Sequence, residues 1–147
     1  MNYLLAIDQG TTGTTSLLIE ASTLKIIDKE KCDYRQIYPK PGWVEHDLSD
    51  IWDSVSLSVS AVLKRTGLNP SKIIAIGITN QRETTCAYTK EGKPLHNAIV
   101  WQDRRTADFC DKHSAKYNEV CRKKTGLPLD PYFSGTKMRW FLDNVNA

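Results

Sequence analysis

Two short apolar runs separated by a glycine- and threonine-rich turn constrain the fold of this chain most strongly. Residues 2–8 and 14–20 each have the composition of a strand, and residues 9–13 between them contain two glycines. A connection this short joins neighbouring strands as an antiparallel hairpin. Residues 25–38 alternate loosely between polar and apolar side chains and predict a third strand, so the chain begins as a three-strand meander.

The hydrophobic pattern changes to a helical period after residue 47. Apolar residues between Ile51 and Leu63 fall at helical spacing and predict one amphipathic helix, with Trp52 in the buried stripe and Gly67 at the end. Residues 73–79 are apolar on both faces, as in a strand buried between helices. Shorter elements are predicted downstream: strands at 84–88 and 98–101, and helices at 103–113, 117–124 and 134–144.

The order of these elements predicts an α/β architecture. It consists of a mixed sheet with an antiparallel three-strand start and helices packed on it. The chain has 147 residues, which suits one domain because a single core commonly serves about 100–200 residues. Hydrophobic residues make up 40% and charged residues 25% of the chain, a balance that excludes disordered and collagen-like proteins.

Charge and hydropathy exclude several classes of partner. The net charge of +3 is small and dispersed, which argues against binding to nucleic acid or to an anionic membrane. No apolar run approaches the roughly 20 residues of a membrane-spanning helix, and the N-terminus lacks the pattern of a signal peptide. The four cysteines form no Cys-x-x-Cys pair, so we expect reduced thiols in a cytoplasmic protein.

The histidines predict no metal site. His46, His96 and His113 are not spaced as metal ligands, and we expect each to be structural or to lie on the surface.

The turn between the first two strands is a candidate phosphate site. Its glycines allow the backbone to expose N–H groups, and its threonine hydroxyls add hydrogen-bond donors. Asp8 ends the first strand, where its carboxylate would meet a phosphate-bound Mg²⁺ through water. The same residues also suit an ordinary hairpin turn, and the loop by itself leaves both interpretations open.

The segment after the apolar strand at 73–79 is a candidate small-molecule site. Ligands of open α/β sheets bind beyond the carboxyl ends of strands, and Arg82 and Glu83 follow this strand closely. An adjacent donor and acceptor suit a polyhydroxylated molecule, whose hydroxyls need both. The alternative is a surface ion pair worth about 0–1 kcal/mol.

Two further segments could form the walls of such a site. Residues 98–105 place Trp101 beside a charged cluster, and residues 128–135 form a proline-stiffened loop that carries Tyr132. The plainer interpretations are a core tryptophan followed by solvated arginines, and a loop packed on the core.

Five stretches, in this order, resemble the N-terminal part of the FGGY family of carbohydrate kinases. They are residues 6–12, 36–47, 75–85, 97–105 and 130–137. The resemblance implies a ribonuclease H-like fold, as in actin and hexokinase, with two domains flanking a cleft. It implies transfer of the γ-phosphoryl group of ATP to glycerol, giving sn-glycerol 3-phosphate. A kinase for another polyol or sugar, and a non-catalytic polyol-binding module, remain alternatives.

The resemblance assigns roles to two sets of residues, with ATP, Mg²⁺ and glycerol as the implied ligands. The phosphate set consists of Asp8, Thr11, Thr12 and Gly13. The polyol set consists of Arg82, Glu83, Trp101 and Tyr132. Within these sets, Asp8 resembles the Mg²⁺-associated aspartate, and Trp101 resembles an apolar wall against the glycerol carbons.

The resemblance also limits what this chain can do alone. It implies an incomplete N-terminal kinase domain over residues 1–147, with the catalytic base and the second domain beyond Ala147. We therefore assign no catalytic residue and expect the chain to be inactive by itself. Thr15 stands where some family members carry arginine, which implies a weaker electrostatic hold on phosphate. Whether the enzyme forms homo-oligomers stays open.

Overall fold

The computed structural model describes residues 1–145 of the chain, which divide into two compact units. Unit 1 consists of Met1–Arg35 and Leu48–Gln81, and unit 2 consists of Gln36–Asp47 and the chain from Arg82 onward. Residues 36–47, which lie between the third strand and the first helix, therefore belong to unit 2.

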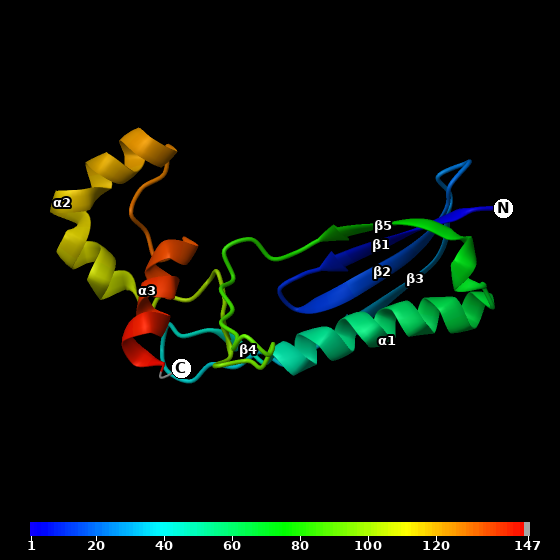
Figure 1. Cartoon of the computed structure of the whole chain (residues 1–147), viewed down its shortest axis with the longest axis horizontal. Coiled ribbons are helices and arrows are strands. Elements are labelled where there is room, and N and C mark those ends of the chain that lie inside the picture. The colour runs from blue at the N-terminus through cyan, green and yellow to red at the C-terminus, as the bar shows by residue number, and fades with distance from the viewer. Residues whose placement is uncertain (146–147) are drawn as a thin grey trace. The chain divides into compact units, whose positions relative to one another are not determined.

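Unit 1 is built on a four-stranded mixed sheet (Figure 1). Its strands are β1 (Tyr3–Gln9), β2 (Gly13–Glu20), β3 (Ile26–Asp33) and β5 (Ile73–Thr79), in the order β3-β2-β1-β5. The pairs β1–β2 and β2–β3 are antiparallel, whereas β1 and β5 are parallel. The predicted antiparallel start and mixed sheet are confirmed, although the third strand ends at Asp33 rather than at Tyr38.

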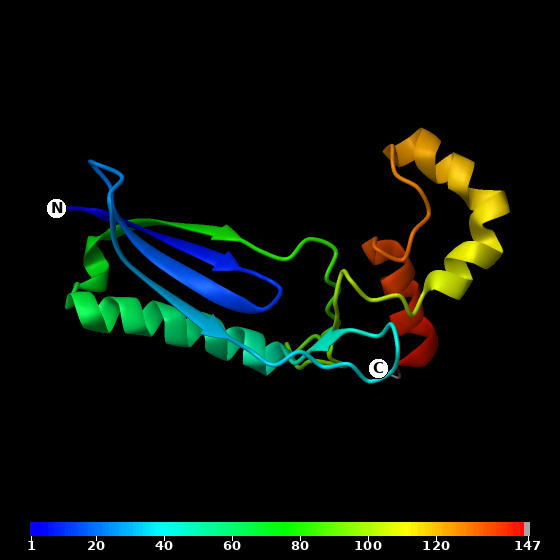
Figure 2. The same ribbon diagram turned by 180° about the vertical axis from the view of Figure 1, so that it is seen from behind.

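Helix α1 (Leu48–Thr66) lies along one side of this sheet in both ribbon views (Figures 1 and 2). Its buried residues are Ser54, Ser58 and Val62. The prediction that Trp52 belongs to the buried stripe is wrong, because its side chain is 68% exposed. The buried hydroxyls of Thr14 and Ser54 are 2.7 Å apart, and those of Ser16 and Ser58 are 2.8 Å apart. Small side chains that satisfy one another's hydrogen bonds therefore line the contact between α1 and β2.

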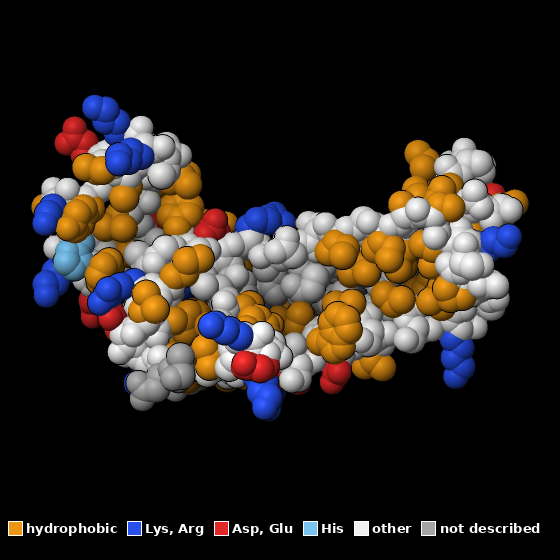
Figure 3. All heavy atoms as spheres, viewed as in Figure 1, with side chains coloured by type: hydrophobic (Ala, Val, Ile, Leu, Met, Phe, Trp, Pro, Cys, Tyr) orange, Lys and Arg blue, Asp and Glu red, His pale blue; other side chains and the backbone are white. Residues whose placement is uncertain are grey.

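Strand β5 has the predicted position but not the predicted burial. It is the edge strand of the sheet, after the short 3₁₀ helix η1 (Pro70–Lys72), and six of its seven residues are exposed. Ile78, for example, is 71% exposed. Figure 3 shows hydrophobic side chains gathered over the surface where β5 and α1 lie. The apolar pattern correctly indicated a strand, but α1 packs mainly over β2 and β3 and leaves β5 uncovered.

Unit 2 contains a two-stranded antiparallel sheet and two helices. They are β4 (Glu45–His46), β6 (Ala98–Ile99), α2 (Ala107–Thr125) and α3 (Ser134–Asn144). The strand predicted at 84–88 is reduced to isolated bridges at Thr85 and Tyr88. The two helices predicted at 103–113 and 117–124 are one continuous helix, because no glycine or proline separates them. Gly126 ends α2 in the left-handed conformation, with φ of 77°.

The core of unit 2 forms around β6 and the two helices. Its buried apolar residues are Ala98, Ile99, Val100, Cys110 and Phe141. All four cysteines of the chain are free thiols. Within residues 1–145, no helix has both the length and the apolar character needed to cross a bilayer.

Candidate functional site

The phosphate set lies on one turn of unit 1, between β1 and β2. Asp8 is exposed near the end of β1, Thr11 is half-buried, Thr12 is exposed, and Gly13 begins β2. The turn is closed by a hydrogen bond of 2.9 Å from the Gly10 N–H to the Gly13 carbonyl. The structure thus brings the whole predicted set together within one short segment.

The residues of this turn fit a phosphate-bound magnesium ion rather than a metal cage. No cluster of three or more histidine, cysteine or carboxylate side chains suited to a metal occurs among residues 1–145. Mg²⁺ bound with phosphate commonly retains several waters and needs only one or two protein carboxylates. The exposed carboxylate of Asp8 meets that requirement.

Gly13 is required by the packing of the sheet itself. A Cβ atom at this position would lie 2.7 Å from the Cys32 carbonyl oxygen and 2.9 Å from the Asp33 Cα. Both are backbone atoms of β3, which cannot move aside as a flexible side chain can. The glycine therefore allows β3 to approach β2 directly beside the turn.

We expect Gly13→Ala to destabilise the chain by about 1–3 kcal/mol, because the added methyl group overpacks β2 against β3. The measurement is urea unfolding followed by far-ultraviolet circular dichroism. Gly77→Ala is the matched control in the same sheet, since a Cβ atom at Gly77 meets nothing within 4 Å. Equal stability losses in the two variants would contradict the steric role of Gly13.

A polar network that the sequence did not indicate supports the same turn. The Tyr34 hydroxyl donates to the Gly10 carbonyl at 2.5 Å and accepts from the side-chain amides of Gln9 and Gln81 at 3.0 and 2.9 Å. The Gln81 amide also donates to the Gln9 carbonyl oxygen at 3.1 Å. Burial raises the pKa of Tyr34, which keeps the phenol protonated as a donor. No local pattern could have shown this network, because it joins residues up to 72 positions apart.

The polyol set lies in unit 2. Glu83 has a φ of 64°, which is uncommon for a residue other than glycine and costs about 1–3 kcal/mol. Its Oε2 accepts hydrogen bonds from the Ser134 backbone N–H and hydroxyl, each at 2.7 Å. These bonds to Ser134 hold the pKa of Glu83 below its ordinary value of 4.5. The neighbouring side chain, Arg82, is exposed.

Two aromatic rings of the set meet edge to face. The ring centroids of Trp101 and Tyr132 are 5.9 Å apart with an interplanar angle of 71°. The backbone N–H of Trp101 donates to the Thr84 hydroxyl at 3.2 Å, which connects Trp101 to the segment that contains Glu83. The structure thus joins three predicted segments of unit 2 at Glu83, Trp101 and Tyr132.

The charged cluster after Trp101 is not the solvated group that its plain interpretation suggests. The side chain of Arg105 is fully buried and donates twice to Asp103, at 3.0 and 2.9 Å, and once to Glu45, at 2.7 Å. Its guanidinium lies 3.8 Å from the ring centroid of Trp43 and 4.6 Å from that of Trp140. Asp103 also accepts from the Val44 N–H, so the cluster fastens residues 43–45 to the start of α2.

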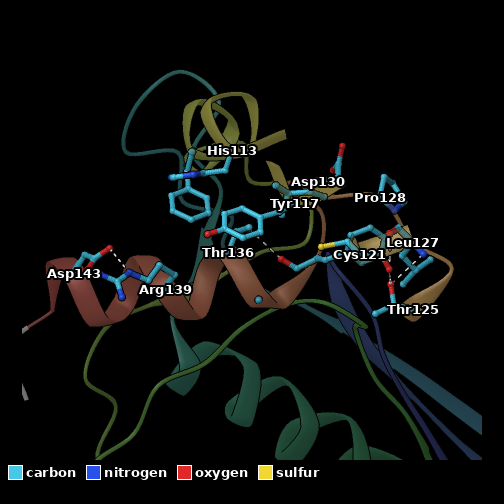
Figure 4. Close-up of a pocket in the computed structure, with 14 residues that line it drawn as sticks. His113, Tyr117, Cys121, Thr125, Leu127, Pro128, Asp130, Thr136, Arg139 and Asp143 are labelled. Atoms are coloured by element: carbon cyan, nitrogen blue, oxygen red, sulfur yellow. Dashed lines mark hydrogen bonds and ion pairs between the residues drawn. The ribbon is translucent and has the colours of Figure 1, made fainter. Parts of the chain in front are cut away.

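A separate hollow of about 770 Å³ lies between α2 and α3 and contains none of the polyol set (Figure 4). Its walls include His113 and Tyr117 from α2, the loop at Pro128, and Arg139 of α3. Arg139 is paired with Asp143 at 2.5 Å. The hollow is mostly apolar, so it lacks the donors and acceptors that a polyol needs.

The fold is that of a sugar-kinase type of protein, and the family comparison agrees. Residues 3–147 match the N-terminal domain of the FGGY family of carbohydrate kinases. The chain belongs to this family, as its five sequence stretches had indicated.

The curated relatives are glycerol kinases. The chain is 54% identical over 147 residues to a glycerol kinase of Burkholderia pseudomallei, covering 99% of this chain and 29% of the relative. It is 53% identical over 145 residues to a glycerol kinase of Burkholderia cenocepacia. The chain therefore spans about 29% of the length of these relatives.

Solved structures of the family share the fold. Plasmodium falciparum glycerol kinase, solved with ADP, is 37% identical, with a TM-score of 0.88 over 98% of this chain and 29% of that one. A xylulose-type kinase of Brucella ovis has a TM-score of 0.89 at 24% identity and supports the fold alone. The predicted α/β fold of the ribonuclease H-like kinases is confirmed.

Proposed function

We propose that this chain forms the N-terminal part of an ATP-dependent glycerol kinase. The observation that carries the proposal is the joining of Glu83, Trp101 and Tyr132 in one unit, in a chain 54% identical to a glycerol kinase. The substrates are glycerol and ATP, and the cytoplasmic location expected from the free cysteines belongs to the same proposal.

The polyol set recognises glycerol through paired hydrogen bonds. A triol offers little apolar area, so its selection depends on donors and acceptors matched to its hydroxyls. Arg82 donates and Glu83 accepts, and each bond to a charged partner contributes about 1.5–3 kcal/mol. The Ser134 N–H and hydroxyl both donate to Oε2 of the Glu83 carboxylate, and in this proposal Oε1 accepts from a glycerol hydroxyl. The Trp101 and Tyr132 rings cover the carbon chain.

The phosphate set holds the nucleotide phosphates. The Thr11 and Thr12 hydroxyls and the backbone N–H groups of the turn donate to phosphate oxygens. Asp8 would hold Mg²⁺ through water, and the ion would neutralise phosphate charge during transfer. The chain's own contribution is positioning, which can supply roughly 7–11 kcal/mol of a reaction barrier. The general base belongs to the remaining length of the enzyme.

We expect Arg82→Ala to weaken glycerol binding by about 1.5–3 kcal/mol, because it removes a charged donor. The measurement is a glycerol titration of the chain followed by the backbone amide shifts in nuclear magnetic resonance spectra. Arg122→Ala, at an exposed position of α2, is the control for loss of positive charge. An unchanged glycerol affinity in Arg82→Ala would overturn the site assignment. Titration with xylulose in parallel distinguishes glycerol from a sugar substrate.

A further inference from the structure

Lys137, in the first turns of α3, is a fully buried lysine. Its ammonium donates to the carbonyl oxygens of Pro131 at 2.8 Å, Tyr132 at 2.5 Å and Phe133 at 3.4 Å. These three consecutive carbonyls belong to the loop that carries Tyr132. The lysine therefore folds back over its own N-terminal loop rather than extending into solvent.

This contact requires the charged form of the lysine. An ammonium has three N–H donors, whereas a neutral amine has two, and three carbonyls are bound here. The pKa of Lys137 lies below its ordinary value, chiefly because of burial, and the nearby carboxylates of Glu83, Asp103 and Asp130 oppose that lowering. A cation near a helix N-terminus is opposed by the helix dipole, so general helix stability does not explain this position.

The same end of α3 also holds Glu83. The N–H and hydroxyl of Ser134, the first residue of the helix, both donate to the Glu83 carboxylate. The Glu83 carboxylate supplies the N-terminal cap of the helix, because Phe133 at the cap position has no capping side chain. Ser134 and Lys137 together therefore contact two of the three segments that carry polyol residues, those of Glu83 and Tyr132.

We propose that Lys137 and Ser134 are positioning residues of the polyol site. Lys137 gathers the carbonyls of residues 131–133 and so fixes the backbone that carries Tyr132. Ser134, placed by the same turn, orients Glu83 in its strained conformation. This inference rests on the proposed function for the identity of the ligand, but the positioning itself can be measured without one.

Two variants test the proposal in the full 147-residue chain. Lys137→Met keeps the length of the side chain and removes its charge, and Lys124→Met on the exposed face of α2 is its matched control. Ser134→Ala removes the hydroxyl bond to Glu83, and Ser134→Thr retains a hydroxyl and should restore it. Three quantities are measured: amide hydrogen exchange at residues 132–134, the pKa of Glu83 by carbon-13 resonance, and glycerol affinity.

Positioning predicts local changes in a chain that stays folded. The Tyr132 and Ser134 N–H groups donate to Asp130 and Glu83, so their exchange in Lys137→Met should accelerate at least about tenfold. The Glu83 pKa should rise toward 4.5 in both variants, because Ser134 and Lys137 both lower it. The glycerol dissociation constant should rise at least about tenfold in both, and Ser134→Thr and Lys124→Met should match the unsubstituted chain.

Unchanged exchange at residues 132–134 and an unchanged Glu83 pKa in folded Lys137→Met would overturn the proposal. If Lys137→Met does not fold, an unaltered Glu83 pKa in Ser134→Ala overturns it instead. Unaltered glycerol affinity in both variants also overturns it. Failure of the unsubstituted chain to bind glycerol would instead overturn the proposed function, and the exchange rates and the Glu83 pKa would still decide the positioning roles.

Discussion

Replacing Arg105 with methionine is expected to destabilise unit 2 by about 3–5 kcal/mol. Methionine fills much of the same volume but leaves the buried carboxylates of Asp103 and Glu45 without their cation. The loss of one partner from a buried ion pair costs more than the pair contributes, because the remaining charge is desolvated and uncompensated. The stacking of the guanidinium on Trp43 and Trp140 is lost as well.

The measurement is urea unfolding followed by tryptophan fluorescence, which reports mainly on unit 2 because three of the four tryptophans belong to it. The adjacent Arg104 is the control: it is exposed and lies 3.4 Å from Asp130, so Arg104→Ala should cost at most about 1 kcal/mol. Arg105→Lys should lose less stability than Arg105→Met and more than Arg104→Ala, since lysine keeps the charge but not the bidentate geometry. Equal unfolding midpoints for Arg105→Met and Arg104→Ala would contradict the buried network.

The second large effect is a loss of stability as the pH falls from 6.5 to 4. His46 is fully buried, and burial lowers its pKa from 6.5 to about 4. Between these values the unfolded chain binds a proton on this imidazole and the folded chain does not. The free energy of unfolding therefore decreases as the pH falls through this window, and at pH 4 it is about 3 kcal/mol lower than at pH 7. Above pH 7 the imidazole of His46 no longer affects it.

The measurement is the free energy of unfolding of the chain and of His46→Gln at several pH values. Glutamine can still donate to the Gln36 side-chain oxygen, which His46 Nε2 contacts at 2.7 Å, but it does not titrate. The difference in stability between the two proteins should thus change by about 3 kcal/mol between pH 7 and pH 4. His113→Gln on α2 is the control, and an identical pH profile for His46→Gln and the unsubstituted chain would contradict burial as the cause.

The sequence predicted correctly those elements of the fold that depend on local patterns. The hairpin, the position of α1, the end of α2 at Gly126 and the start of α3 depend on propensities and turn residues within a few positions. The two helices predicted in place of α2 were wrong, since a weak hydrophobic pattern concealed an uninterrupted helix. The burial of β5 and Trp52 was wrong because local patterns do not show which neighbour covers a face.

The candidate site likewise has a part that the sequence predicted and a part that only the tertiary structure shows. The sequence by itself predicted the two sets of candidate ligand residues, because their motifs are short and keep their order along the chain. Only the tertiary structure decided which groups hold them: Tyr34 beneath the phosphate turn, Ser134 on Glu83, and Lys137 on the loop of Tyr132. Such roles depend on burial and on hydrogen bonds closed by packing, and a buried lysine or arginine has the same sequence signature as a solvated one.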